Sequence, residues 1–174
     1  QPPPVTILDA GNLTLGTGLL AVKAAEAARE GREVDEIVQI LEDQIKRTYC
    51  FAGLDTLEFL RRSGRLTRLQ SGLGSMLQIK PVLTMYNGEM GMERVRTRKK
   101  AVGRVVELVS ELGPLEQLAI VHTHAPKRAE SLRRQVEHLF PSNPPRLSAE
   151  VTPVIGTHIG PGAVGFVAIT SPGP

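Results

Sequence analysis

Aromatic side chains are scarce in this sequence: no tryptophan, two tyrosines and four phenylalanines make up 3% of its 174 residues. Proteins that bind single-stranded nucleic acids use aromatic rings as stacking platforms. The net charge of +3, from 21 basic and 18 acidic residues, is also small. We therefore expect no nucleic acid among the partners of this chain.

Cysteine and long apolar segments are equally scarce. The single cysteine, Cys50, excludes an internal disulfide and favours a cytoplasmic location. No apolar run approaches the roughly 20 residues that a helix needs to cross a bilayer, and the first residues have no signal-peptide pattern. Because the chain begins with Gln1 rather than methionine, we expect it to be a piece of a longer protein.

Two common catalytic motifs are missing. A glycine-rich phosphate loop followed by Lys-Ser or Lys-Thr is absent, which disfavours an NTPase, and no G-x-S-x-G nucleophile elbow occurs. His122 and His124 would share one face of a strand and could begin a metal site, with Glu150 and His158 available in principle. Because no third ligand stands at a plausible spacing, we expect no metal, although a metal-dependent hydrolase remains a hypothesis.

The residues that are present predict an α/β fold. The composition, 41% hydrophobic and 22% charged, fits a globular domain with a buried core. Helical periodicity and end signals predict helices over residues 19–30, 34–47, 57–62, 65–77, 98–112 and 127–140. Apolar runs predict strands over residues 5–8, 49–54, 79–86, 90–96, 118–123, 151–155 and 163–169. We expect a mixed β-sheet, part parallel and part antiparallel, with helices packed on it.

Local signals specify some of the connections. Asn87-Gly88 between two strands is a strong hairpin signal, and Thr97 can cap the helix that follows. Gly72 and Gly74 fall inside a predicted helix, where each costs about 1 kcal/mol relative to alanine. Their presence suggests a close approach by a neighbouring element or by a ligand.

One glycine-rich stretch, residues 156–165, carries a titratable side chain, His158. We expect this stretch to be a loop that joins two strands. Glycine admits positive φ and lets another group approach the backbone, while Pro161 fixes one φ. A small anionic group could therefore meet His158 and nearby N–H groups. Alternatively, the stretch is a tight strand connection whose histidine faces solvent.

Two basic clusters are candidates for an anion or partner site. Residues 94–100 include Arg96 and Arg98 and fall at a strand-to-helix junction, where helix N-termini favour anions and arginine binds oxygens in a bidentate manner. Residues 61–65 end at Arg65 after a glycine turn. Either cluster can equally be a solvated face.

Several stretches, in the correct order, resemble motifs of the DegV family of bacterial fatty-acid-binding proteins. Residues 55–66, DTLEFLRRSGRL, are similar to the family's DTLEYLKKGGRI, and residues 73–83, LGSMLQIKPVL, are similar to LGSLLNIKPIL. Residues 93–101, ERVRTRKKA, resemble RVRTRKKA, and residues 155–165, IGTHIGPGAVG, resemble IGAHTGPGALG. The resemblance covers almost the whole chain.

The resemblance implies the fold of the C-terminal portion of a DegV protein. Residues 1–48 would form a strand and helices at the junction with an N-terminal lobe, and residues 49–174 the lipid-binding domain. A Thr-rich turn and an SG-T-Y-SA motif, whose hydroxyls help bind the fatty-acid carboxylate in the family, do not occur here. Ala10 and Thr14 stand where the family commonly has serines. We expect such a piece to expose an apolar surface, through which it could form a homodimer.

The resemblance also implies a carrier rather than an enzyme, with no cofactor. A long-chain fatty acid would lie in an apolar tunnel with its carboxylate bound by His158. The carrier would present this carboxylate to a fatty-acid kinase, which makes acyl phosphate for phospholipid synthesis. Arg65, Arg96 and Arg98 would dock the kinase or hold the phosphate. The alternative function is a regulatory or interaction module that uses its basic face to bind protein or nucleic acid.

Overall fold

A six-stranded mixed sheet organises the fold. The computed structural model describes residues 5–65, 79–142 and 147–173, and within these ranges the strand order is β3-β2-β1-β6-β4-β5. The strands are β1 (Thr48–Gly53), β2 (Lys80–Tyr86), β3 (Glu89–Val95), β4 (Leu115–His122), β5 (Leu147–Glu150) and β6 (Val164–Thr170). All neighbours are antiparallel except β4 and β5, which are parallel. The predicted mixed α/β sheet is therefore confirmed.

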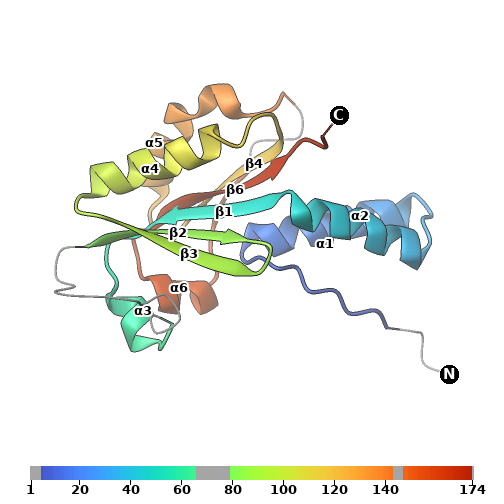
Figure 1. Ribbon diagram of the computed structural model, residues 1–174, viewed down its shortest axis with the longest axis horizontal. Coiled ribbons are helices and arrows are strands. Elements are labelled where there is room, and N and C mark those ends of the chain that lie inside the picture. Colours follow the sequence, from blue (N-terminus) through green and yellow to red (C-terminus); the bar gives the residue numbers. More distant parts are fainter. Residues whose placement is uncertain (1–4, 66–78, 143–146, 174) are drawn as a thin grey trace.

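Helices cover both faces of this sheet. They are α1 (Leu15–Arg29), α2 (Val34–Lys46), α3 (Glu58–Arg62), α4 (Arg98–Ser110), α5 (Pro126–Gln135) and α6 (Pro153–Ile159), with a 3-10 turn at Glu137–Leu139. Helices α4 and α5 lie above the sheet in Figure 1, and α3 and α6 lie below it. None of the described helices is long and apolar enough to cross a bilayer.

Two local signals have the predicted effect. Asn87 and Gly88 form the β2–β3 turn with φ of 47° and 80°, the pair of positive values that a two-residue type I′ turn requires. The Thr97 hydroxyl accepts a hydrogen bond from the Lys100 N–H at 3.2 Å and caps α4. The hairpin and the helix start are thus determined by residues next to one another in the chain.

Because side chains alternate along a strand, each face of the sheet has its own core. The core under α4 and α5 is closely packed, and its largest fully buried sheet residues are Phe166, Leu118, Ile120 and Val82. The opposite face holds two smaller clusters. One lies around Leu19 of α1 and Cys50 of β1, and the other contains Leu54, Leu57, Leu60 and Ala163.

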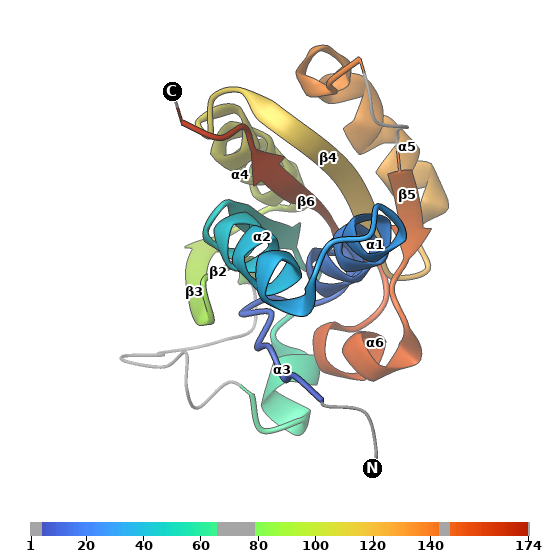
Figure 2. The same ribbon diagram turned by 90° about the vertical axis from the view of Figure 1, so that its right-hand side faces the viewer.

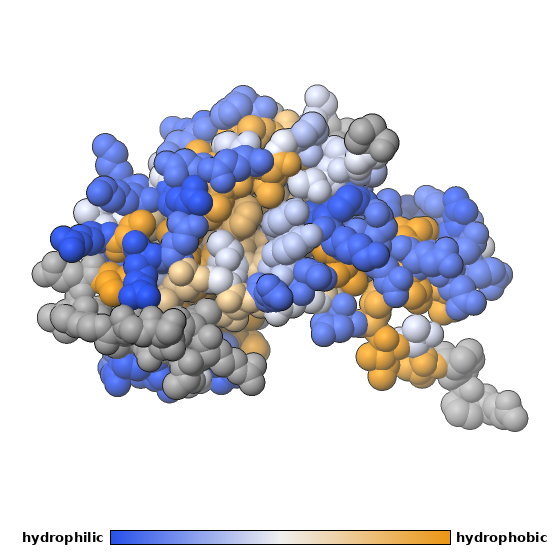
Figure 3. Space-filling view, in the orientation of Figure 1, coloured by the Kyte–Doolittle hydropathy of each residue, from blue (hydrophilic) through white to orange (hydrophobic). Residues whose placement is uncertain are grey.

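The segment before α1 is not the predicted strand. Residues 5–8 have no regular structure, and Val5 and Ile7 are 83% and 91% exposed. This apolar segment extends away from the sheet at the lower right of Figures 1 and 3. An isolated extended segment is not a stable strand, because a strand needs a hydrogen-bonded neighbour, and no described strand pairs with residues 5–8.

Three further predictions need correction or lie outside the described residues. Residues 151–155 are not a strand, because β5 ends at Glu150 and α6 begins at Pro153. The helix predicted over residues 127–140 ends at Gln135, before the 3-10 turn. The helix predicted over residues 65–77 falls almost entirely in the part of the chain that the structure does not describe.

Candidate functional site

A cavity of about 220 Å³ lies on the face of the sheet that carries α1, α3 and α6. Its floor is a row of four residues paired across four strands: Leu83, Ala52, Gly165 and Val121. Ala52 and Gly165 occupy the two central strands of this row. The small side chain of Ala52 leaves room that a Leu or Phe would fill, whereas Gly165 is required by close contact, since a Cβ there would clash with the Phe51 carbonyl oxygen on β1. The hollow therefore results from small residues at the centre of the sheet.

The walls of the cavity come from segments far apart in the sequence. Leu13 and Thr14, just before α1, lie at the end where Cys50 and Met85 line the sheet. Leu60 of α3 and three residues of α6 form the wall at the other end. Figure 2 shows α1, α3 and α6 gathered on this side of the sheet. Most lining side chains are apolar, so the cavity suits an apolar ligand.

His158 lies on this wall, but in a helix and not in the predicted loop between strands. Pro153 stands at the first turn of α6, and Gly160 ends the helix with φ of 75°. A Cβ at Gly160 would also clash with the ring of Phe59 in α3. Pro153 and Gly160 therefore mark the start and end of a helix, which is the usual asymmetry of these residues. Pro161 and Gly162, from the stretch predicted as a loop, form a turn between α6 and β6, where Gly162 has φ of 86°.

The cavity wall contains two buried polar atoms without a hydrogen-bond partner, His158 Nδ1 and Thr14 Oγ1. In the described part of the chain these are the only buried side-chain nitrogen or oxygen atoms in that condition. Leaving such a group unpaired costs about 1–3 kcal/mol, which a ligand with a polar end can offset. The sequence predicts His158 as a site residue. It gives no such role to Thr14, which stands where the family commonly has a serine.

Thr14 also has a strained backbone. Its φ and ψ are 53° and −130°, a conformation that a β-branched residue rarely adopts, and its hydroxyl does not cap α1. Strain of this kind persists only where the surrounding structure enforces it, and it concentrates at binding sites. The geometry of Thr14 is therefore independent support for a site at this cavity.

The three candidate arginines lie in different environments. Arg65 lines the cavity with His158, is exposed, and donates to the Ser63 carbonyl oxygen at 2.8 Å. Arg96 is exposed at the end of β3 and is not part of the cavity wall. Arg98 is engaged by Asp55, both of whose carboxylate oxygens lie 2.8 Å from its guanidinium nitrogens. The cavity wall thus contains His158 and Arg65 but neither Arg96 nor Arg98.

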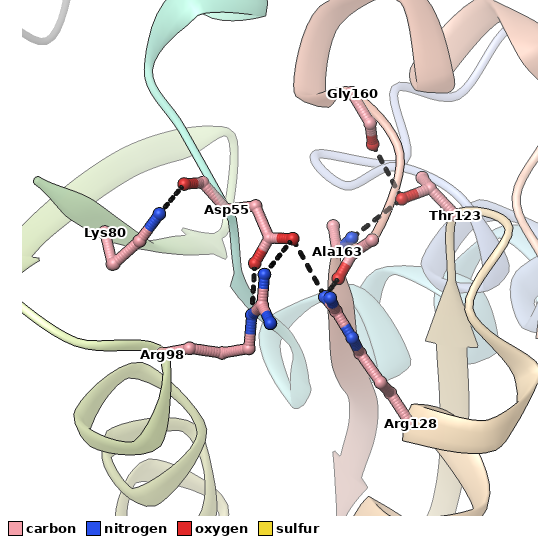
Figure 4. Close-up of polar contacts among 8 residues, drawn as sticks. Asp55, Lys80, Arg98, Thr123, Arg128, Gly160 and Ala163 are labelled. Atoms are coloured by element: carbon pink, nitrogen blue, oxygen red, sulfur yellow. Dashed lines mark hydrogen bonds and ion pairs between the residues drawn. The ribbon is translucent and has the colours of Figure 1, made fainter. Parts of the chain in front are cut away.

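Asp55 is the centre of a polar network beside the cavity (Figure 4). Besides the pair with Arg98, its Oδ2 accepts a hydrogen bond from Arg128 Nη1 at 2.9 Å. Burial alone would raise the pKa of the Asp55 carboxyl, but the hydrogen bonds from Arg98 and Arg128 outweigh burial and lower it. The next residue, Thr56, accepts a hydrogen bond at its Oγ1 from the Glu58 N–H at 3.1 Å, just before α3.

Contrary to the prediction, His122 and His124 do not share one face of a strand. The strand ends at His122, which is buried and accepts a hydrogen bond at Nδ1 from the Ala125 N–H. His124 lies beyond the strand with φ of 47°, its side chain is 89% exposed, and it is 3.6 Å from Glu150. Because the strand ends between them, the imidazoles do not share a face. The described residues contain no cluster of three or more His, Cys, Asp or Glu that could hold a metal.

Cys50 lines the cavity but has no nucleophilic character. The residue is 5% exposed, and burial raises the pKa of its thiol to about 12. A neutral thiol in an apolar environment behaves as a small hydrophobic group. The cavity therefore offers apolar surface, the imidazoles of His122 and His158, three threonine hydroxyls and, at Arg65, one cation. Of these polar groups, His158 Nδ1 and Thr14 Oγ1 are the ones buried without a partner, and they suit the binding of a ligand with a polar end.

A family model described as "Uncharacterised protein, DegV family" matches residues 1–171. The chain belongs to the DegV family. The DegV domain-containing protein SCO2569 of Streptomyces coelicolor is 37% identical over 169 residues, which are 95% of this chain and 60% of that protein.

Two solved DegV structures are similar in fold and are described by their ligand. The structure of DegV, a fatty acid binding protein from Bacillus subtilis, is 31% identical with a TM-score of 0.78, and the match covers 94% of this chain and 60% of that one. A DegV family protein from Thermus thermophilus, described by its fatty acid binding, is 29% identical with a TM-score of 0.81 and coverages of 98% and 62%. The chain therefore spans about three fifths of the length of these relatives.

Proposed function

We propose that this chain is part of a fatty-acid carrier and supplies the acyl-binding cavity together with one contact to the carboxylate. The observation that carries the proposal is the unpartnered, buried Nδ1 of His158 on the wall of an apolar cavity. An apolar ligand without a polar end would leave this nitrogen unpaired. A fatty acid matches both properties, and fatty acid binding is the description of the Bacillus subtilis relative.

Burial of the acyl chain supplies most of the binding free energy in this proposal. Each methylene that leaves water contributes about 0.8 kcal/mol. The cavity of about 220 Å³ is smaller than the roughly 300–1,000 Å³ of complete ligand pockets. We infer that residues 49–174, with Leu13 and Thr14 on the cavity wall, hold one part of the acyl chain. Residues 1–48 would join this part to another lobe, against which the rest of the ligand lies.

The carboxylate needs hydrogen bonds, because burying an ionised group without them is costly. The imidazole of His158 donates one of these in our proposal. Arg65, on the same cavity wall, adds positive charge near the polar end of the ligand. Its position favours a role in holding a phosphate that forms on that carboxylate.

The carrier would then present the carboxylate to a fatty-acid kinase in the cytoplasm, for phospholipid synthesis. It would not itself catalyse the phosphorylation. Exposed Arg96, and Arg98 with a side chain 54% exposed, would contact the kinase from the β3–α4 junction. Because Arg98 is already paired with Asp55, we expect a smaller contribution from Arg98 than from Arg65.

The basic junction also supports the alternative of a regulatory module. Residues 94, 96 and 98–100 are all basic and exposed, at the N-terminus of α4. Binding through this surface would weaken steeply with salt and would not depend on His158. Such behaviour, without any bound lipid, would favour the alternative over the carrier.

Calorimetric titration of the full-length protein with palmitate tests the carrier proposal. Replacing His158 by Ala should weaken palmitate binding by about 10- to 150-fold, because a hydrogen bond to a charged group contributes about 1.5–3 kcal/mol. The affinity for hexadecanol, which lacks the carboxylate, should differ much less between the wild type and His158→Ala. His138→Ala is the matched control, because that exposed histidine does not line the cavity. Equal palmitate affinities of the wild type and His158→Ala would refute the role of His158.

A further inference from the structure

Asp55 joins three elements of the fold that are distant in the sequence. It lies two residues after the end of β1, and its carboxylate contacts Arg98 at the start of α4 and Arg128 in α5. Its carbonyl oxygen accepts a hydrogen bond from Lys80 Nζ at 2.5 Å, at the start of β2. Figure 4 shows Arg98 and Arg128 meeting at the Asp55 carboxylate, while Lys80 reaches the Asp55 carbonyl oxygen. One carboxylate thus balances two guanidinium groups.

Arg128 links the Asp55 carboxylate to the segment between α6 and β6. The same Nη1 that contacts Asp55 donates to the Gly162 carbonyl oxygen at 2.6 Å. Gly162 has φ of 86°, and a Cβ there would lie 2.7 Å from Asp55 Oδ2 and 2.8 Å from Arg128 Nη1. The backbone at Gly162 is therefore fitted against the ion pair with no room for a side chain.

Thr123 holds the same segment from its other side. Its Oγ1 donates to the Gly160 carbonyl oxygen at 2.6 Å and accepts from the Ala163 N–H at 2.9 Å, and its carbonyl oxygen accepts from the Gly162 N–H at 2.7 Å. The segment 160–163 is thus held at both of its glycines. It begins two residues after His158 and ends at Ala163, a cavity-lining residue.

We propose that Asp55 is a positioning residue for the ligand site: through Arg128 it holds the segment 160–163, and this segment fixes the end of α6 and hence His158. The proposal rests on the proposed function for its effect on fatty acid affinity. Its structural part, the hold on the segment, is independent of any ligand. Helix α6 has only seven residues, so its own hydrogen bonds do little to fix its position.

Loss of the Asp55 charge should have a specific effect. In Asp55→Asn, Arg98 and Arg128 remain side by side without their shared counter-charge, and their repulsion separates them. Arg128 then no longer lies against the Gly162 carbonyl. Because the segment starts two residues after His158, its displacement moves the imidazole relative to the cavity. Small displacements of a binding group weaken ligand binding.

Hydrogen exchange and palmitate titration of the full-length protein test this proposal together. In Asp55→Asn, the amides of Gly160, Gly162 and Ala163 should exchange about tenfold faster, while those of β4 and β6 keep their protection. Palmitate should bind about tenfold more weakly. Arg128→Gln should do the same, and the double variant should add little, because the two side chains act as one unit.

Glu93→Gln is the matched control. Glu93 accepts two hydrogen bonds from Arg104, at 2.8 and 3.1 Å, in a partly exposed pair that does not touch the segment 160–163. It should leave both the local exchange and the palmitate affinity unchanged.

Three results would overturn the role of Asp55. They are wild-type palmitate affinity in both Asp55→Asn and Arg128→Gln, faster exchange spread evenly over the whole chain, and unchanged exchange at residues 160–163. If the wild type itself does not bind palmitate, the proposed function fails. The exchange measurement then still decides whether Asp55 holds this segment. If Asp55→Asn does not fold, Arg128→Gln provides the test.

Discussion

The two faces of the sheet both carry apolar side chains but differ in how completely the space above them is filled. On the face under α4 and α5, Phe166 and Ile120 are completely buried and pack against two helices of 10 and 13 residues. On the opposite face, the row containing Ala52 and Gly165 is roofed by α3 and α6, of five and seven residues, and by the start of α1. We call these the packed face and the hollow face.

The difference shows how one sheet can combine stability with binding. Long helices and large side chains exclude space on the packed face, so it contributes most of the hydrophobic stabilisation. Short elements and small side chains on the hollow face leave a cavity, and the polar atoms without partners lie there. The binding site therefore occupies the face that contributes less to folding, in agreement with the usual compromise between stability and function.

The largest expected effect is on the packed face. Phe166→Ala should lower the free energy of unfolding by about 3–5 kcal/mol, since it opens a cavity among side chains that cannot collapse into it. Leu83→Ala on the hollow face should cost less, at or below the low end of the roughly 2–5 kcal/mol range for such changes, because Leu83 already borders empty space. Urea denaturation measures both, and equal losses would remove the distinction between the faces.

Replacing a small residue by a larger one on each face tests the same difference between the packed face and the hollow face. Ala168→Leu on the packed face should destabilise the protein by about 1–3 kcal/mol, because no space exists for the added atoms. Ala52→Leu on the hollow face should leave the free energy of unfolding nearly unchanged and should weaken palmitate binding, because its side chain enters the cavity. Thermal unfolding with and without palmitate gives both quantities. A large loss of stability in Ala52→Leu would show that the hollow is not available space.

The smallest expected effect is a gain in stability. Thr14→Val keeps the β-branched shape and removes a buried hydroxyl without a partner, so the lipid-free protein should become more stable by about 1 kcal/mol. Thr123→Val is the control with the opposite sign, because that hydroxyl makes two hydrogen bonds and its loss should cost about 1–3 kcal/mol. Urea denaturation of delipidated protein compares them, and destabilisation in both variants would mean that Thr14 has a partner in solution.

Much of the fold could be predicted from neighbouring residues. The Asn87-Gly88 turn, the Thr97 cap and the amphipathic pattern of α2 depend on side chains a few positions apart, and each is present in the structure. The prediction was wrong where one local signal has two meanings. Around His158, the glycines suit a loop between strands as well as a short helix that begins at Pro153 and ends at Gly160, and in the fold this helix packs against α3.

The candidate site was less predictable than the fold. His158 stands out as an imidazole among glycines, whereas Thr14 has nothing in its sequence neighbourhood that indicates a buried, unpaired hydroxyl. The link from Asp55 to Arg128 joins residues 73 positions apart, and the chain between them contains many other basic side chains. No pattern of spacing selects that partner.

The sequence by itself determined the type of most elements, the hairpin turn and, through motifs in a fixed order, the family. These depend on backbone preferences and on contacts between residues close in the chain. The tertiary structure alone decided that His158 belongs to a helix, that Ala52 and Gly165 meet at the floor of a cavity, and that Asp55 holds the segment beside it. Burial and polar pairing depend on which distant segments come together, and that is decided by packing over the whole chain.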